Sequence, residues 1–377
     1  YTPIVVFLAL GTAVLPPLVA GGDWNYWIYT ALSFLVMSCP CALVLSVPLA
    51  FFSGIGAGSK KGILFKGGVA LESMADVKAV VMDKTGTITE GNFVLQKTVT
   101  VGNTDEDTLL RLAASCEQVS THPIANSIVT AAKEKGMELT RPSTLKEIAG
   151  EGILAVMDGN VILCGNKKLM EHHNINISAY NNEVFGTEVL VAIEGEYAGY
   201  LVISDTIKAD AKSAITAIKK QNIVTAMLTG DAQNSAEAVA KETGIDEVHA
   251  KLLPQDTLKK LRETYTSVMF VGDGINDAPV LAGADVGAAM GSGADAAIEA
   301  ADVVFMTSSM SAIPDALRIA KSAVAISWQN IVFALAIKIA VMILGLCGFA
   351  SMWMAVFADT GVAMLCVLNS IRVLYKK

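Results

Sequence analysis

A carboxylate that follows an apolar stretch is the first place in this sequence where chemistry is expected. Ala79-Val80-Val81-Met82 predicts a buried strand, and Asp83 follows it where Lys84-Thr85-Gly86-Thr87 must turn. Loops at the carboxyl ends of strands carry the chemistry of open α/β sheets. A carboxylate there can attack a phosphoryl group, and the neighbouring backbone N–H groups and the hydroxyls of Thr85 and Thr87 can hold phosphate oxygens. A lone Asp-Lys pair would more often form a simple turn, so this interpretation needs partners elsewhere in the chain.

Two later segments supply such partners. The apolar run from Ile223 ends in Thr229-Gly230-Asp231, and the run from Val268 ends in Gly272-Asp-Gly-Ile-Asn-Asp277. Either segment alone could be an ordinary strand-to-helix turn. In this order after Asp-Lys-Thr-Gly-Thr, however, they resemble the haloacid-dehalogenase-like core of P-type ATPases, the ion pumps that form a phospho-aspartate. The alternation of strands and helices predicts a doubly wound parallel sheet.

The resemblance implies a role for each motif. Asp83 is the nucleophile, Asp273 and Asp83 bind Mg²⁺ with Asp277 close behind, Thr229 holds a phosphate oxygen, and Lys251 offsets phosphoryl charge. Mg²⁺ prefers carboxylate and phosphate oxygens, and phosphoryl transfer depends mostly on positioning and charge neutralisation. The same motifs add further members to the expected catalytic and magnesium set, namely Lys84, Thr85, Gly230, Asp231 and Asn276.

Thr85 separates a pump from a phosphatase. Phosphatases of this superfamily place a second Asp two residues after the nucleophile as a general acid/base, and here that position is Thr85. Without that carboxylate the phospho-aspartate should hydrolyse slowly by itself. A membrane-anchored phosphatase is therefore the less favoured alternative, as is a metal-binding membrane protein with a vestigial catalytic core.

An inserted domain is expected between the first strand and its continuation. Its motifs resemble the nucleotide-binding domain of the heavy-metal branch of P-type ATPases, which implies ATP contacts at Glu117, His122, Pro123, Gly150, Gly152 and Gly165. His-Pro alone is usually a loop, and Gly-x-Gly alone is weak evidence. Cys116 and Cys164 are expected to be buried structural residues.

The two ends of the chain are strongly apolar. A hydrophobic content of 53% exceeds that of an ordinary soluble enzyme, and the net charge of −8 argues against nucleic-acid binding. Spans are predicted over Thr2 to Ala20, Trp27 to about Ala57, Ala323 to Leu346 and Met352 to Val373. Basic residues follow or flank these spans on one side, which predicts cytoplasmic termini and a cytoplasmic middle: Lys60, Lys61, Lys66, Arg318, Lys321, Arg372, Lys376 and Lys377.

Polar groups within these spans predict a transport site. In an intact helix Cys39 and Cys41 would point roughly 200° apart, but Pro40 kinks the helix and can bring both thiols to one cavity. Lys338 and Asp359 are the only charged residues well inside the last hairpin. Both lie roughly 15 Å from its turn, near the middle of a ~30 Å hydrocarbon core. Intramembrane charges are usually functional and paired, although a purely structural pair is the alternative.

The metal follows from these donors and from the resemblance. Two thiolates and a carboxylate suit Zn²⁺, Cd²⁺ or Pb²⁺. The Lys and Asp-Thr-Gly pattern resembles the zinc/cadmium subgroup, in which Lys338 would serve as counterion to Asp359. A Cu⁺ pump, the other alternative, would show Tyr-Asn and Met-x-x-Ser in these helices, and this sequence does not.

We therefore expect the carboxyl-terminal portion of a zinc/cadmium/lead-exporting P-type ATPase in the plasma or inner membrane. Tyr1 begins almost directly in a span, and the family's Thr-Gly-Glu actuator loop does not occur in this sequence. We accordingly expect the actuator domain and upstream helices to be missing partners, and this piece to hydrolyse ATP poorly. The expected domains are a membrane hairpin (1–76), a phosphorylation domain in two segments (77–92 and 204–317), an inserted α+β nucleotide-binding domain (93–203) and a second hairpin (318–377).

Overall fold

The structure, a computed structural model, describes residues 2–38, 41–120, 122–181, 186–230, 233–250, 259, 261–346 and 352–375. The chain divides into two compact units. The first comprises Tyr1–Val80, Lys220–Ile223 and Leu258–Lys377, and the second comprises Val81–Lys219 and Val224–Thr257. The division falls inside strand β2 (Ala79–Asp83), whose first four residues are fully buried.

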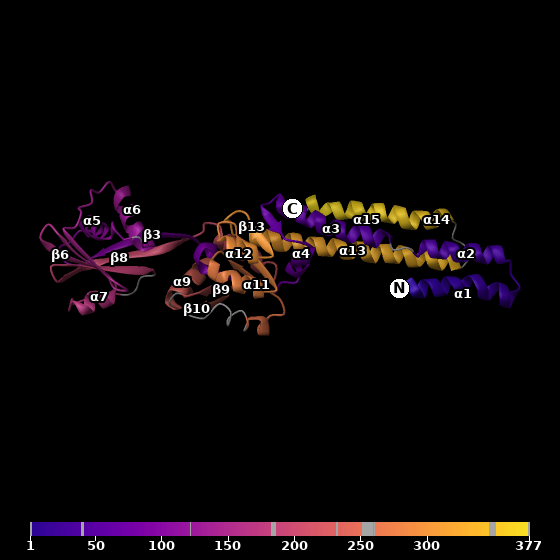
Figure 1. The fold of residues 1–377 in the computed structure, drawn as a ribbon, viewed down its shortest axis with the longest axis horizontal. Helices are drawn as coiled ribbons and strands as arrows, with labels where there is room; N and C mark the ends of the chain where they lie inside the picture. The colour runs from indigo at the N-terminus through magenta and orange to yellow at the C-terminus, as the bar shows by residue number, and fades with distance from the viewer. Residues whose placement is uncertain are drawn as a thin grey trace. The chain divides into compact units, whose positions relative to one another are not determined.

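Long apolar helices dominate the first unit (Figure 1). Among the described residues, three segments are long and apolar enough to cross a membrane, namely Ala42–Ser59, Ala312–Leu344 and Phe357–Tyr375, and Pro3–Val19 is a shorter apolar helix. These are the membrane helices that the sequence predicts. Their bounds in order are α1 Thr2–Ala20, α2 Trp24–Met37, α3 Cys41–Ser59, α13 Ala312–Leu346, α14 Met352–Val356, η3 Phe357–Gly361, α15 Val362–Ile371 and η4 Arg372–Tyr375.

Two of these bounds differ from the sequence expectation. The predicted span from Trp27 to about Ala57 is described as two helices, α2 and α3, with Asp23 capping α2 through the N–H of Asn25. Helix α13 begins at Ala312 instead of Ala323. Its first turns carry Asp315, Arg318 and Lys321, and these charges interrupt the apolar run on which the sequence expectation was based.

A buried polar cluster joins three of the apolar helices. The amide of Asn330 on α13 donates to the Cys366 carbonyl (3.1 Å) and to Oγ of Ser370 (2.8 Å) on α15. Oγ of Ser370 in turn lies 3.0 Å from the Ser46 carbonyl of α3. Because apolar helices gain little from hydrophobic burial in lipid, interhelical hydrogen bonds of this kind fix their relative register.

The first unit also holds a small α/β layer. Strands β11 (Val268–Gly272), β12 (Val286–Met290) and β13 (Val303–Phe305) pair in parallel, and β1 (Ile63–Phe65) adds antiparallel to β13. These parallel strands are buried throughout, as expected when helices flank the sheet. The associated helices are α4 Gly68–Ala75, α11 Ala278–Gly283 and α12 Asp295–Ala300, with a 3₁₀ turn η2 at Ile275–Asp277.

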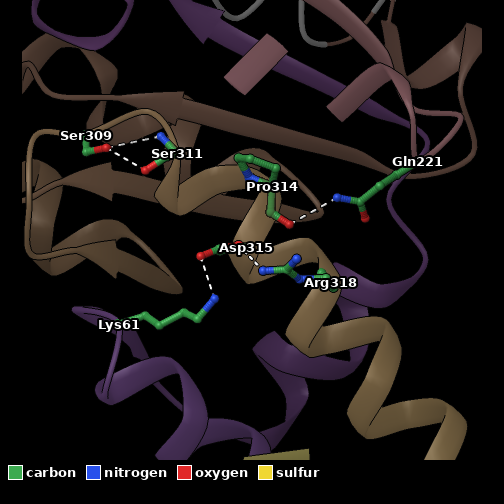
Figure 2. Close-up of polar contacts among 7 residues, drawn as sticks. All are labelled: Lys61, Gln221, Ser309, Ser311, Pro314, Asp315 and Arg318. Carbon is green, nitrogen blue, oxygen red and sulfur yellow. Dashed lines mark hydrogen bonds and ion pairs between the residues drawn. The ribbon is translucent and has the colours of Figure 1, made fainter. Parts of the chain in front are cut away.

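Polar contacts tie the start of α13 to this layer (Figure 2). Asp315, in the first turn of α13, accepts from Lys61 Nζ at 2.7 Å and also pairs with Arg318. The Gln221 side chain donates to the Pro314 carbonyl at 3.0 Å. These contacts connect the long apolar helix α13 directly to the strand layer of its own unit.

The second unit is built on an antiparallel sheet of six strands in the order β3-β8-β7-β6-β5-β4. Helices α5 (Glu106–Glu117) and α6 (Pro123–Glu134) pack on one face and α7 (Lys167–His172) on the other (Figure 1). The strands are β3 Thr89–Thr100, β4 Thr144–Ile148, β5 Gly152–Met157, β6 Asn160–Gly165, β7 Thr187–Ile193 and β8 Glu196–Ile207. A parallel pair, β9 (Val224–Thr229) and β10 (Glu247–Ala250), and helices α8 (Ala211–Lys219) and α9 (Gln233–Thr243) complete the unit.

Candidate functional site

The turn after Asp83 has a defined backbone geometry. Asp83 ends the buried strand β2 and is itself half-buried. Thr85 (φ −74°, ψ 131°) and Gly86 (φ 72°, ψ −21°) have the angles of the two central residues of a type II turn. The second position requires a positive φ, which explains the glycine. Lys84 is half-buried and Thr85 is exposed.

An unsatisfied hydroxyl lies in this turn. Oγ1 of Thr87 is buried and makes no hydrogen bond within the described part of the chain. Buried polar atoms are normally paired, so an orphan beside a candidate nucleophile needs a reason. A phosphate oxygen accepting from this hydroxyl would supply one. The sequence predicts that the hydroxyls of Thr85 and Thr87 can hold phosphate oxygens, and for Thr87 this stays a prediction that its unpaired Oγ1 supports.

In the first unit, Asp273 and Asp277 follow the buried strand β11. Asp277 is only 6% exposed, and its Oδ2 accepts from the N–H groups of Asp273 (3.2 Å) and Gly274 (2.9 Å). Burial raises the pKa of Asp277, and these backbone hydrogen bonds partly oppose the rise. Asp277 therefore shapes the loop that presents Asp273. Gly272 is needed beside it, because an added Cβ would lie 2.6 Å from Oδ2 of Asp277.

The remaining predicted catalytic residues fall in several places. Thr229 ends β9 and is 7% exposed, Gly230 follows it, and Asn276 is exposed in the turn after β11. Asp231 and Lys251 lie outside the described residues. The donor chemistry suits magnesium, because Asp83 and Asp273 offer hard carboxylate oxygens at the ends of buried strands.

A pocket of about 320 Å³ opens on the six-stranded sheet of the second unit. Predicted nucleotide contacts line it together, namely Glu117, His122, Gly150, Gly152 and Gly165. They come from the end of α5, the start of α6 and strands β5 and β6. Pro123 is the first residue of α6, directly after His122. The structure thus brings these residues to one pocket, and their contact with ATP stays a prediction.

Two of the glycines allow a close backbone approach. Gly152 and Gly165 face each other in the register of β5 and β6. A Cβ on Gly152 would lie 2.3 Å from the Cys164 carbonyl oxygen, and one on Gly165 would lie 2.2 Å from that of Glu151. Any side chain would force the strands apart, so this wall of the pocket is bare main chain. Asn166 supports it by donating to the Gly150 carbonyl at 2.8 Å.

The polar groups of the pocket have definite partners. Nδ1 of His122 accepts from the N–H of Ile124 at 3.3 Å and so caps α6, while the ring stays exposed. The Cys164 thiol donates to Oε1 of Glu117 at 3.6 Å. Burial is the main cause that raises the pKa of Glu117 to about 7. The predicted burial of Cys116 and Cys164 is confirmed, but the contact of Cys164 with Glu117 was not predicted.

Within the apolar helices, the structure pairs Lys338 with Asp359. Nζ of Lys338 lies 3.5 Å from Oδ1 of Asp359, and their side chains are 12% and 25% exposed. The separation is that of an ion pair, but the atoms lack hydrogen-bond geometry, and Oδ1 has no hydrogen bond among the described residues. Asp359 lies in the wide turn η3 between α14 and α15. Cys39 and Pro40 lie outside the described residues, and of Cys41 only the main chain is described, as the first residue of α3.

Sequence reasoning missed residues around the Asp83 turn. Lys208 is buried, and its Nζ donates to the Gly86 carbonyl at 2.7 Å. Oγ1 of Thr89 donates to Asp205 and lies 3.0 Å from the Lys84 carbonyl. A single Lys after a strand is a weak signal, and nothing in the sequence indicates its partner.

Comparisons with known proteins agree with this geometry. Models described as haloacid dehalogenase-like hydrolase match residues 77–285 and 255–317. A "Cadmium, zinc and cobalt-transporting ATPase" of Bacillus subtilis (strain 168) is 49% identical over all of this chain and 55% of its own length. A "Zinc-transporting ATPase" of Synechocystis sp. (strain ATCC 27184 / PCC 6803 / Kazusa) is 47% identical over 99% of this chain and 52% of its own.

A solved structure resembles the chain as a whole. The crystal structure of a zinc-transporting PIB-type ATPase in the E2.Pi state matches with a TM-score of 0.89 and 35% identity, covering 99% of this chain and 62% of that one. The chain spans about half the length of the curated relatives it matches. The predicted fold class, helical membrane segments with a haloacid-dehalogenase-like α/β part, is confirmed. The chain belongs to the haloacid dehalogenase-like hydrolase family and, within it, resembles the heavy-metal-transporting P-type ATPases.

Proposed function

We propose that this chain carries the catalytic and ion-binding parts of an ATP-driven exporter of Zn²⁺, Cd²⁺ or Pb²⁺. The observation that carries the proposal is the nucleophile position. Asp83 ends a buried strand and enters a type II turn that holds the unpaired hydroxyl of Thr87. This arrangement suits a carboxylate that receives a phosphoryl group whose oxygens are then bound by the turn.

The proposed cycle has two chemical steps. A carboxylate oxygen of Asp83 attacks the γ-phosphorus of ATP, the bond to the bridging oxygen breaks, and ADP leaves. Water later cleaves the acyl phosphate, which returns the carboxylate and releases inorganic phosphate. Thr85 occupies the position of the acid/base carboxylate of related phosphatases, so the second step should be slow without help from elsewhere.

The other residues position the reactants. Thr229 and Lys251 would hold and neutralise phosphoryl oxygens, with Lys84, Gly230, Asp231 and Asn276 in the same catalytic set. Asp83, Thr85 and Asp273 would hold Mg²⁺, which neutralises phosphate charge when it is bound. Asp277 would act mainly by shaping the Asp273 loop, because its buried Oδ2 already accepts two backbone N–H groups.

The pocket lined by Glu117 and His122 would bind the adenosine end of ATP. Supporting this, Gly152 and Gly165 line the pocket without side chains, together with Glu117 and His122. His122-Pro123 would present the imidazole at the pocket mouth, since Nδ1 is already used to cap α6. The ring face and Nε2 would then be available to the nucleotide.

The membrane helices would hold the transported ion. Cys39, Cys41 and Asp359 would provide ligands, because thiolates and a carboxylate suit borderline and soft divalent cations. Lys338 would pair with Asp359 once the ion has left, which is supported by their 3.5 Å separation. The basic residues flanking the spans support a cytoplasmic catalytic part in a cell membrane.

Metal-stimulated phosphoenzyme formation tests the proposal. The full-length protein in lipid should incorporate the γ-phosphate of ATP in an acid-stable, hydroxylamine-sensitive form when Zn²⁺, Cd²⁺ or Pb²⁺ is present. Cu⁺ under reducing conditions should not stimulate it. Rapid phosphate release from simple phosphomonoesters without a phosphorylated protein would instead identify a phosphatase.

A further inference from the structure

A buried lysine holds the turn that follows Asp83. Lys208 comes directly after β8, is 5% exposed, and its Nζ donates to the Gly86 carbonyl at 2.7 Å. Burying an ammonium group is costly unless it is paired. An apolar residue of similar size could fill the same space without the cost of burying a charge. The buried ammonium group of Lys208 at this turn therefore suggests a functional role.

The main chain of Lys208 is anchored to the same turn. Thr89 faces Ile207 in the register of β3 and β8, and the next N–H, that of Lys208, donates to the Ile88 carbonyl at 3.1 Å. The strand pair thus continues to the edge of the turn. From this fixed point the Lys208 side chain reaches back to Gly86.

The opposite end of the turn is held as well. The Lys84 carbonyl accepts from the N–H of Thr89 and lies 3.0 Å from its Oγ1, and this hydroxyl also contacts Asp205. Residues of β3 and the end of β8 therefore hold the carbonyl groups of Lys84 and Gly86. These carbonyls lie on either side of the Thr85–Gly86 peptide.

Holding a carbonyl fixes the N–H of the next residue. In a planar trans peptide the C=O and the following N–H point in opposite directions. Fixing the Gly86 carbonyl on Lys208 therefore directs the Thr87 N–H away from Lys208. Fixing the Lys84 carbonyl on Thr89 likewise directs the Thr85 N–H away from Thr89. A cationic donor on the carbonyl also polarises its peptide and strengthens that N–H as a donor.

We propose that Lys208 is a positioning residue for phosphoryl transfer: with Thr89, it holds the turn so that the Thr87 hydroxyl and the Thr85 N–H face the oxygens of the phosphoryl group on Asp83. This inference rests on the proposed function and adds a residue to it. Lys208 acts through the Gly86 peptide and does not itself touch the phosphoryl group. Removing a preorganised donor to a reacting oxygen typically costs about 10²–10³ in rate, so misaiming one should cost about 10- to 100-fold.

The test compares Lys208→Met with Lys208→Arg and with Lys212→Met in the full-length protein. Lys212 is an exposed lysine on α8 of the same unit and serves as the matched control. Lys208→Met should slow phosphoenzyme formation from both ATP and inorganic phosphate by about 10- to 100-fold. The affinity for ATP should not change, because Lys208 does not line the nucleotide pocket. Lys208→Arg should recover part of the rate, and Lys212→Met should match the wild type.

The outcomes are distinct. If Lys208→Met forms phosphoenzyme at the wild-type rate, or if it loses ATP affinity in proportion to the rate, the inference is wrong. If Lys208→Met does not fold, as judged by its thermal transition, Lys208→Gln and Lys208→Arg decide. The inference then predicts the rate order Lys, Arg, Gln at constant ATP affinity, and equal rates would overturn it. Failure of the proposed function is separate, since the wild type itself would then not be labelled on Asp83.

Discussion

The Cys164 thiol on β6 donates a hydrogen bond to Oε1 of Glu117 across 3.6 Å. The two residues are 47 positions apart in sequence, and Glu117 lines the pocket that we propose for the nucleotide. Burial raises the pKa of Glu117 to about 7, the charge of Glu147 raises it further, and the thiol hydrogen bond opposes the rise. Burial likewise raises the pKa of Cys164, which therefore stays a thiol donor at neutral pH.

ATP affinity should fall as the pH rises through 7. Below this pH Glu117 is protonated and neutral, so it can donate a hydrogen bond to the base and does not repel the nucleotide anion. Above this pH, the carboxylate cannot donate this hydrogen bond and it repels the nucleotide anion. Binding of a fluorescent ATP analogue between pH 5.5 and 8 should show a midpoint near 7 in the wild type. Glu117→Gln should show no such transition, and Cys164→Ala should move the midpoint upward because the opposing hydrogen bond is lost.

The Gln variant also separates Glu117 from other titrating groups. ATP itself and His122 of the pocket contribute equally in both proteins, so the difference between the two pH profiles belongs to Glu117. Identical profiles would show that the carboxyl does not contact the nucleotide. The free energy of unfolding should also fall as the pH rises. The folded state retains the proton between the unfolded pKa of 4.5 and about 7, so Glu117 destabilises the fold progressively as the pH rises through that range.

Replacement of His122 should weaken ATP binding without affecting the phosphorylation chemistry. His122→Ala removes the ring and also the cap of α6, since Nδ1 accepts from Ile124. His122→Asn is the matched control, because Asn is a good N-cap but lacks the ring. Both variants should lose about tenfold in ATP affinity, equivalent to one contact of about 1.4 kcal/mol. Phosphorylation from inorganic phosphate should remain normal. If His122→Asn binds ATP with wild-type affinity, His122 contributes only by capping α6 and does not contact the nucleotide.

The Lys338–Asp359 pair should separate ion capture from ion release. Asp359→Ala should abolish Zn²⁺-stimulated phosphorylation, because it removes a ligand and leaves the Lys338 ammonium unpaired in an apolar setting. Lys338→Ala should bind Zn²⁺ nearly normally but transport it slowly, since no cation replaces the metal at Asp359. Equilibrium binding and vesicle transport of radioactive Zn²⁺ measure the two steps. Lys338→Arg retains the charge and should transport faster than Lys338→Ala. Normal transport by Lys338→Ala would contradict this role.

Local sequence patterns predict the elements and several of the pocket residues. A carboxylate after four apolar residues was placed correctly at the end of β2. The resemblance of the Glu117, His122 and glycine motifs to a nucleotide-binding domain predicted residues that line one pocket. Hydropathy located the membrane helices, but it missed the first turns of α13, because Asp315, Arg318 and Lys321 interrupt the apolar run there. Asp315 is held by its contact with Lys61.

Long-range polar contacts could not be predicted in this way. Lys208 and the Gly86 carbonyl are 122 positions apart, and no periodicity or motif connects them. The same holds for Cys164, which composition alone marks as an inert buried thiol. The role of Asp277 as the acceptor that shapes its own loop depends on backbone geometry at Gly272 and Gly274. Such contacts depend on how the elements pack, which one sequence without a structure does not specify.

The identity of the phosphorylated residue is the central claim, and labelling of Asp83→Asn tests it most directly. The full-length variant and the wild type would be incubated with γ-labelled ATP and Zn²⁺, quenched in acid and measured for protein-bound phosphate. Asn keeps the size of the side chain but cannot form an acyl phosphate. We predict hydroxylamine-sensitive label on the wild type and none on Asp83→Asn, with ATP binding retained in both. Label on Asp83→Asn at the wild-type level would contradict the account.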